Sequence, residues 1–279
     1  MDASCRESVK ISLQFCSEND IEKGDDCMDQ LMEDSGCKFD HEDGRLFTDY
    51  PLYCEGYHKP MCRGVLHLLC AVMLPTVLLF FIQECRGSPL GIAVCVCYVT
   101  SNTFCYGVSG MYHIFEWNPR EEILLQKLDH CGIAILSVGT ILPDALLVLG
   151  SGLSEINNNI GYAMAGISTI LCCYTCRQIW MRRPSVGLQA LVAVWWVLPF
   201  LVPNYLYMTT TEFLAMLMTC LFQGLGVMVF VYRAPDPMPD FFGYHEVFHT
   251  LVVFAGISVL VCNYSIVHRY GLAYEQKSI

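Results

Sequence analysis

The chain has 279 residues, of which 54% are hydrophobic, and a mean hydropathy of +0.43. A single soluble core of this size does not need so large an apolar fraction, so composition excludes an ordinary soluble domain and indicates a polytopic membrane protein. The net charge of −11 belongs almost wholly to one end, because residues 1–55 hold 15 acidic and 5 basic residues (net −10) and the rest hold 12 and 11 (net −1). The sequence contains no basic patch that predicts nucleic-acid binding.

The N-terminal segment, residues 1–58, is acidic and poor in aromatic residues, which predicts a loosely ordered segment. It has no apolar core behind a basic start, so it does not resemble a signal peptide. Its cysteines could pair as disulfides outside the cell, whereas in the cytoplasm they would stay reduced or bind metal. Six of the 17 cysteines lie in or directly after this segment: Cys5, Cys16, Cys27, Cys37, Cys54 and Cys62. The sequence does not identify a protein partner for it.

Seven apolar stretches follow, each close to the roughly 20 residues that a membrane-spanning helix needs. They predict an all-α membrane protein in which residues 59–270 form a seven-transmembrane-helix bundle, followed by a short C-terminal tail, 271–279. The stretches are 65–83, 90–115, 122–149, 159–179, 186–203, 212–232 and 244–267.

Basic residues in the short loops predict the orientation of this bundle, since they are enriched on the cytoplasmic side. The side that holds the N-terminus carries Lys59, Arg63, Arg120, Arg177, Arg182, Arg183 and Arg233. The other side carries Arg86, Arg269 and Lys277. We therefore expect a cytoplasmic N-terminus and a C-terminus outside the cell or in a lumen.

Polar residues accumulate where three of these helices reach the same membrane face. The end of the second helix, the start of the third and the start of the seventh must share a face, whichever way the chain is inserted. The second ends with Ser109 and His113, the third carries Asp129 near its start, and the seventh opens with His245 and His249. Residues four apart project from one side of a helix, so each pair can face a common site.

Three imidazoles with an open fourth position are typical of a catalytic zinc site. Zinc would lower the pKa of a bound water toward about 7, and Asp129 could hold that water or take its proton. Ser109 could orient water or substrate. Taken singly, His113 and Ser109 also fit roles in helix packing and hydrogen bonding. A buried carboxylate such as Asp129 is costly in a membrane, and this favours a metal site over a polar packing cluster.

The letters His245-Glu246-Val247-Phe248-His249 also match the zinc-peptidase pattern, in which Glu246 would be the general base. That class takes its third ligand from later in the chain, where only His268 and Glu275 remain, both near the far membrane face. Chain order therefore disfavours a metalloprotease. Glu246 is more simply a polar residue at a helix start, where its charge suits the dipole.

The chain resembles the hemolysin III family, within the wider progestin and adipoQ receptor family, from about Lys59 to Tyr270. The order and spacing of several short motifs carry the resemblance. They are Lys59-Pro60, Arg63-Gly64-Val65-Leu66-His67, Ser109 with His113 and Trp117, Leu128-Asp129-His130, Gly139-Thr140 with Pro143, Pro235-Asp236-Pro237, and Phe242-Gly243-Tyr244-His245-Glu246-Val247-Phe248-His249.

The resemblance implies a zinc ion near the cytoplasmic face, held by His113, His245 and His249. It implies that Asp129 holds the zinc-bound water and that Ser109 is its neighbour. The chain departs from the family in the third helix, where Asp144 follows Pro143. Asp144 lies about 22 Å along the helix from Asp129, so we expect it at the opposite interface. We expect His67 to be a packing or interfacial residue.

Two functions from different classes remain open. One is a zinc-dependent hydrolase of a lipid amide, whose substrate enters from the bilayer and which the resemblance suggests is ceramide-like. The other is a membrane receptor or signalling protein that binds a small lipid and in which zinc ties three helices together. A pore-forming hemolysin is a third possibility, which the lack of a long polar stripe disfavours.

Overall fold

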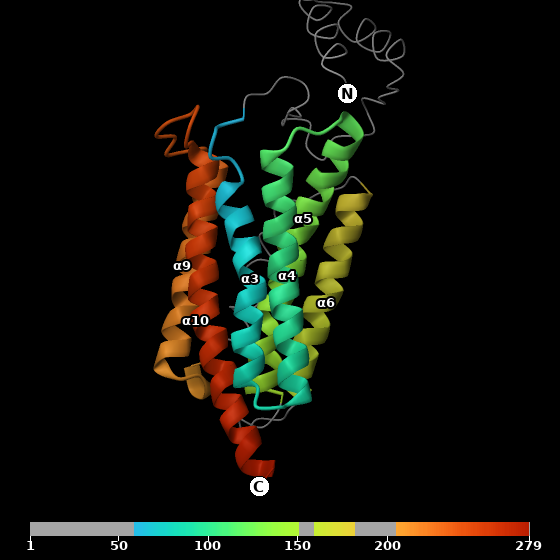
Figure 1. Cartoon of the computed structure of the whole chain (residues 1–279), viewed down its shortest axis with the longest axis vertical. Helices are drawn as coiled ribbons and strands as arrows, with labels where there is room; N and C mark the ends of the chain where they lie inside the picture. Colours follow the sequence, from blue (N-terminus) through green and yellow to red (C-terminus); the bar gives the residue numbers. More distant parts are fainter. Residues whose placement is uncertain (1–58, 151–158, 182–204, 279) are drawn as a thin grey trace, which may run out of the picture.

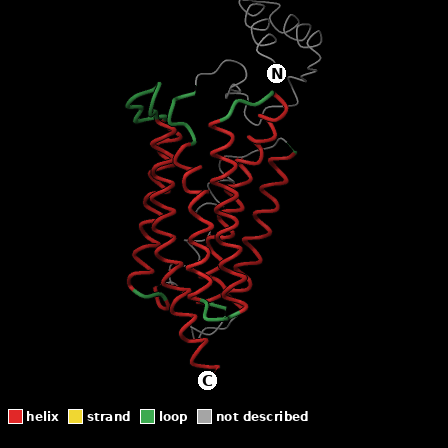
Figure 2. Tube along the Cα trace, viewed as in Figure 1, coloured by secondary structure: helices red, strands yellow, loops and turns green. Residues whose placement is uncertain are grey.

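The computed structural model describes residues 59–150, 159–181 and 205–278. These residues form antiparallel helices that run side by side, with the connecting loops gathered at the two ends of the bundle (Figures 1 and 2). The helices are α3 (Val65–Glu84), α4 (Pro89–Ile114), α5 (Pro119–Leu142), α6 (Asn159–Trp180), α9 (Thr210–Tyr232) and α10 (Tyr244–Ser278). A short π-helical segment, η2 (Pro143–Val148), continues α5.

Five of the described helices are long and apolar enough to cross a membrane: α3, α4, α5 with η2, α9 and α10. The chain is therefore a multi-pass membrane protein, as its composition predicts, and every element longer than a turn in its described residues is helical. Helix α6 has 22 residues but is not among the five, since polar residues dilute its apolar sequence. The predicted stretch 186–203 lies outside the described residues, so the count of seven spanning helices stays a prediction.

Local sequence explains where the helices begin. Asn118 caps α5 in a reciprocal arrangement with Glu121, and Thr209 caps α9 in the same way with Glu212. In both cases a side-chain oxygen accepts a hydrogen bond from a backbone N–H that the helix itself leaves unpaired. Ser88 caps α4, whose first residue is a proline.

Helix α10 is longer than the sequence predicts. It spans 35 residues, or about 52 Å, which exceeds the roughly 30 Å hydrocarbon core of a bilayer. Its last turns project beyond the rest of the bundle (Figure 1). The segment 271–278 is thus a continuation of this helix.

Two ion pairs at this end of the bundle differ sharply in burial. Glu212 of α9 is fully buried and accepts hydrogen bonds from Arg269 of α10, whose Nη2 lies 2.9 Å from Oε2. Arg86, after α3, pairs with Glu275 at 3.1 Å, but these side chains are 36% and 48% exposed. Only the first pair holds a charge that is shielded from solvent.

Arg269→Met should therefore destabilise the protein far more than Arg86→Met. The first change leaves the buried Glu212 carboxylate without its cation, which costs about 3–5 kcal/mol. The second removes an exposed pair that contributes about 0–1 kcal/mol. Melting temperatures of the detergent-purified variants measure the difference, and equal shifts would contradict it.

Candidate metal centre

The structure brings together the three imidazoles that the sequence places at one membrane face. His113 lies in the last turn of α4, and His245 and His249 lie in the first two turns of α10. One ligand atom from each ring lies within 4.8 Å of the other two. His113 and His249 are buried, with exposed fractions of 4% and 3%. The arrangement can hold a metal ion.

The chemistry of these three residues fits such an ion. Nitrogen atoms that are each about 2.0–2.1 Å from one ion lie within about 4 Å of one another, so small side-chain rotations would complete the geometry. The Nε2 atom of His245 is buried and has no hydrogen-bond partner among the described residues. A buried nitrogen without a partner is costly unless something binds it, and a metal ion would do so.

Asp129 and Ser109 lie beside these rings. The Oδ2 atom of Asp129, on α5, is 3.9 Å from Nε2 of His113, too far for a direct hydrogen bond. Its carboxylate interacts with the hydroxyl of Ser109, which lies one turn before His113 on α4. The carboxylate and the imidazole are thus close enough to contact one small molecule between them.

His67 is a fourth histidine at this centre, and the sequence interpretation of it as a packing or interfacial residue is incomplete. Its ring stacks on His249 with centroids 3.9 Å apart and planes 17° apart. Its Nδ1 lies 3.0 Å from the Ser109 hydroxyl oxygen. His67 is not one of the three histidines whose ligand atoms lie within 4.8 Å of one another. The order of the helices could have identified His67 from the sequence, since the start of α3 shares a membrane face with the end of α4.

Glu246 is engaged away from these rings. Its Oε1 pairs with Nε of Arg63, and its Oε2 accepts a hydrogen bond from the backbone N–H of Gly243 at 2.7 Å. Arg63 and Glu246 are 7% and 1% exposed, so the pair is buried. The carboxylate therefore joins the segment before α3 to the start of α10. This geometry supports a structural role at a helix start over the general-base role of a zinc peptidase.

Glycines let α3 approach the centre closely. Gly64 has a positive φ of 80°, and a Cβ there would lie 2.8 Å from Cβ of His113. A Cβ on Gly110 would lie 2.9 Å from both the backbone nitrogen and Cβ of Leu68. Any larger side chain at either position would push α3 away from α4 and from His113.

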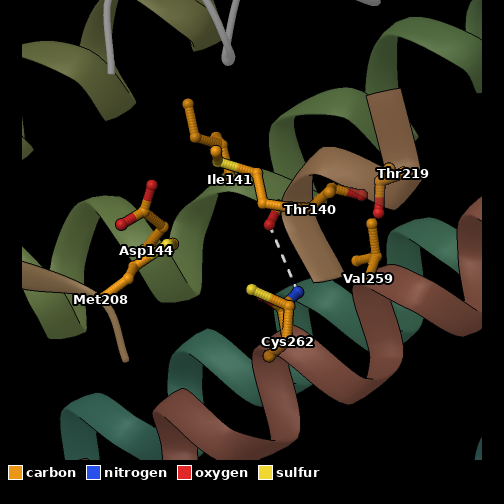
Figure 3. Close-up of a pocket in the computed structure, with 9 residues that line it drawn as sticks. Thr140, Ile141, Asp144, Met208, Thr219, Val259 and Cys262 are labelled. Atoms are coloured by element: carbon orange, nitrogen blue, oxygen red, sulfur yellow. Dashed lines mark hydrogen bonds between the residues drawn. The ribbon is translucent and has the colours of Figure 1, made fainter. Parts of the chain in front are cut away.

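Asp144, which the sequence predicts at the interface opposite Asp129, is buried between helices. It is 5% exposed and lines a small cavity with Thr140, Thr219 and Asn263 (Figure 3). Asn263 donates a hydrogen bond to the backbone oxygen of Thr140 at 3.3 Å. The cavity offers about 10 Å³ to the centre of a water-sized sphere, enough for about one water. It is too small for a lipid, and on α10 it lies about 21 Å from His249.

These features define a multi-pass helical membrane protein with a buried three-histidine centre at one end of its bundle. The sequence model of the haemolysin-III related family matches residues 55–260, a range that includes every residue of the centre. The chain therefore belongs to the haemolysin-III related family. No solved structure matches it.

Proposed function

We propose that this protein is a zinc-dependent hydrolase that cleaves an amide bond in a membrane lipid. The observation that carries the proposal is the group formed by three histidines and a carboxylate, with 3.9 Å between Asp129 and His113. Three histidine ligands with an open position are typical of catalytic zinc. The zinc would supply an activated water and polarise the carbonyl oxygen of the substrate.

The residues around the zinc ligands have distinct tasks in this proposal. Asp129 accepts a proton from the attacking water and returns it to the departing amine nitrogen. Ser109 contacts the Asp129 carboxylate and holds its orientation. His67 is a positioning residue, since it hydrogen-bonds Ser109 and stacks on His249. The imidazole thus links the hydroxyl to one of the proposed zinc ligands.

The surroundings favour a lipid as the substrate. The centre lies at one end of a bundle whose flanking helices α3, α9 and α10 expose large apolar side chains, including Leu69, Leu225 and Phe254. A lipid can approach such a surface from within the bilayer. The resemblance to the hemolysin III and progestin and adipoQ receptor families favours a ceramide-like amide.

A receptor or signalling role is the second candidate, and the burial of the centre favours it. His113 and His249 are almost inaccessible in this conformation, and the Arg63–Glu246 pair is buried as well. A zinc ion in this position would then tie α4 to α10 and stabilise one conformation. A lipid would act as a ligand and would leave unchanged.

Asp129→Asn distinguishes the two functions. We expect at least a 100-fold loss of amide-lipid turnover, because general acid–base catalysis contributes about 10²–10⁴-fold. Zinc content and melting temperature should stay close to those of the unmodified protein. Released fatty acid is the measurement, with ceramide in detergent micelles as the substrate.

Asp144→Asn is the matched control, because it makes the same change in the same membrane segment about 22 Å away. It should leave turnover unchanged. If Asp129→Asn turns over as fast as the unmodified protein, the proposed mechanism is wrong. If zinc-loaded unmodified protein cleaves no amide lipid, the receptor function is favoured.

A further inference from the structure

A pair of thiols lies at the end of the bundle opposite the metal centre. Cys85 ends α3 and Cys95 lies in the second turn of α4, and their Sγ atoms are 3.5 Å apart. Both side chains are completely buried. The two sulfur atoms are therefore in contact and shielded from solvent.

The turn that joins the two helices holds this pair together. Arg86 and Gly87 both have positive φ values, 48° and 80°, which reverse the chain within a few residues. Gly91 leaves space for the Cys85 side chain, since a Cβ at Gly91 would lie 3.2 Å from Sγ of Cys85. The backbone thus brings Cys85 against the first two turns of α4.

Contacts with α10 place this turn at the far end of the bundle. Ser88 donates a hydrogen bond to Tyr270 at 3.3 Å, and Arg86 pairs with Glu275. Along α4, Cys95 and His113 are about 27 Å apart. The pair therefore lies near the membrane face that the distribution of basic residues assigns to the outside of the cell or to a lumen.

We propose that Cys85 and Cys95 form an intramolecular disulfide when this face meets an oxidising compartment. A disulfide places its sulfur atoms about 2.05 Å apart, so the two thiols must approach by about 1.5 Å, which rotation about their Cα–Cβ bonds can supply. The oxidant is an external disulfide, such as that of an oxidising folding enzyme, and exchange takes place before the turn packs against α10.

Disulfide exchange with the external disulfide takes two steps. One cysteine thiolate attacks a sulfur of the external disulfide, so that a mixed disulfide forms and one external thiolate leaves. The second cysteine then attacks the protein sulfur of the mixed disulfide and expels the other external thiolate. Two electrons and two protons pass from Cys85 and Cys95 to the external pair, which is released as two thiols.

The disulfide would covalently close the turn between α3 and α4. It would stabilise the end of the bundle where α3, α4 and α10 meet, independently of any metal at the other end. A second group of neighbouring thiols, Cys131, Cys172 and Cys176, lies between α5 and α6 toward the metal-centre end. Because that end faces the cytoplasm in the predicted orientation, these thiols should stay reduced.

Sequential labelling of the full-length protein in cell membranes tests the proposal. Free thiols are alkylated in denaturing detergent, disulfides are then reduced, and the new thiols receive an alkylating reagent of different mass. Peptide mass spectrometry should find the second label on Cys85 and Cys95, and the first label on Cys131 and Cys176. The first label on both Cys85 and Cys95 would overturn the proposal.

The Cys85→Ser variant tests whether Cys85 is the disulfide partner of Cys95. If the two cysteines pair with each other, Cys95 should change from the second label to the first in this variant. Retention of the second label on Cys95 would show a different partner and would also overturn the proposal. If the variant folds poorly, the first label on both Cys85 and Cys95 of the unmodified protein would still overturn the proposal.

Discussion

We expect His249→Ala and His245→Ala to lose the bound metal. Each change removes one of three proposed ligands, and the remaining two cannot enclose an ion. The expected loss of zinc affinity is at least about 100-fold, the upper end of the range for residues that only support a ligand. Metal content per chain, measured by mass spectrometry on detergent-purified protein, should fall from about one zinc to near zero.

His268→Ala is the matched control for this loss. His268 lies on the same helix, but its Nδ1 contacts Glu84 at 2.5 Å and its side chain is 45% exposed, far from the three-histidine group. This variant should retain its zinc. Full zinc content in His249→Ala would mean that the three imidazoles are a polar packing cluster and would remove the basis of both proposed functions.

The second large effect is expected at the buried Arg63–Glu246 pair. Arg63→Met leaves the Glu246 carboxylate buried without its cation, which should destabilise the protein by about 3–5 kcal/mol. Because Glu246 lies between His245 and His249 in the chain, the same change should also lower the zinc content. The melting temperature and the metal content are the two measurements.

The double variant Arg63→Met with Glu246→Gln should recover much of the lost stability. It removes both charges, while the Gln amide oxygen can still accept the hydrogen bond from the Gly243 N–H. It also separates the proposed enzyme from a zinc peptidase, in which Glu246 would be the general base. Under our proposal the double variant keeps its zinc and its lipid turnover. A stable, zinc-loaded and inactive double variant would instead support a catalytic role for Glu246.

The sequence by itself determined the membrane class and most of the helices. Five predicted apolar stretches correspond to helices that are long and apolar enough to span a bilayer, since length and hydropathy are properties of a segment alone. It also placed Ser109, His113, Asp129, His245 and His249 at one membrane face. The direction of each spanning helix follows from its order in the chain, so the membrane face at which each helix end lies can be assigned without knowledge of packing.

Only the tertiary structure decided which side chains contact one another at a given depth in the bundle. The partners of His67, Arg63 and Asp144 depend on how each helix is rotated about its axis. Neither α3 nor α10 has one distinct apolar face, so their sequences contain little information on that rotation. The Cys85–Cys95 contact depends on the conformation of the turn between them. Hydropathy reflects the free energy of transferring a segment from water into an apolar phase. These contacts depend instead on shape, close approach of backbones and hydrogen bonding inside the bundle.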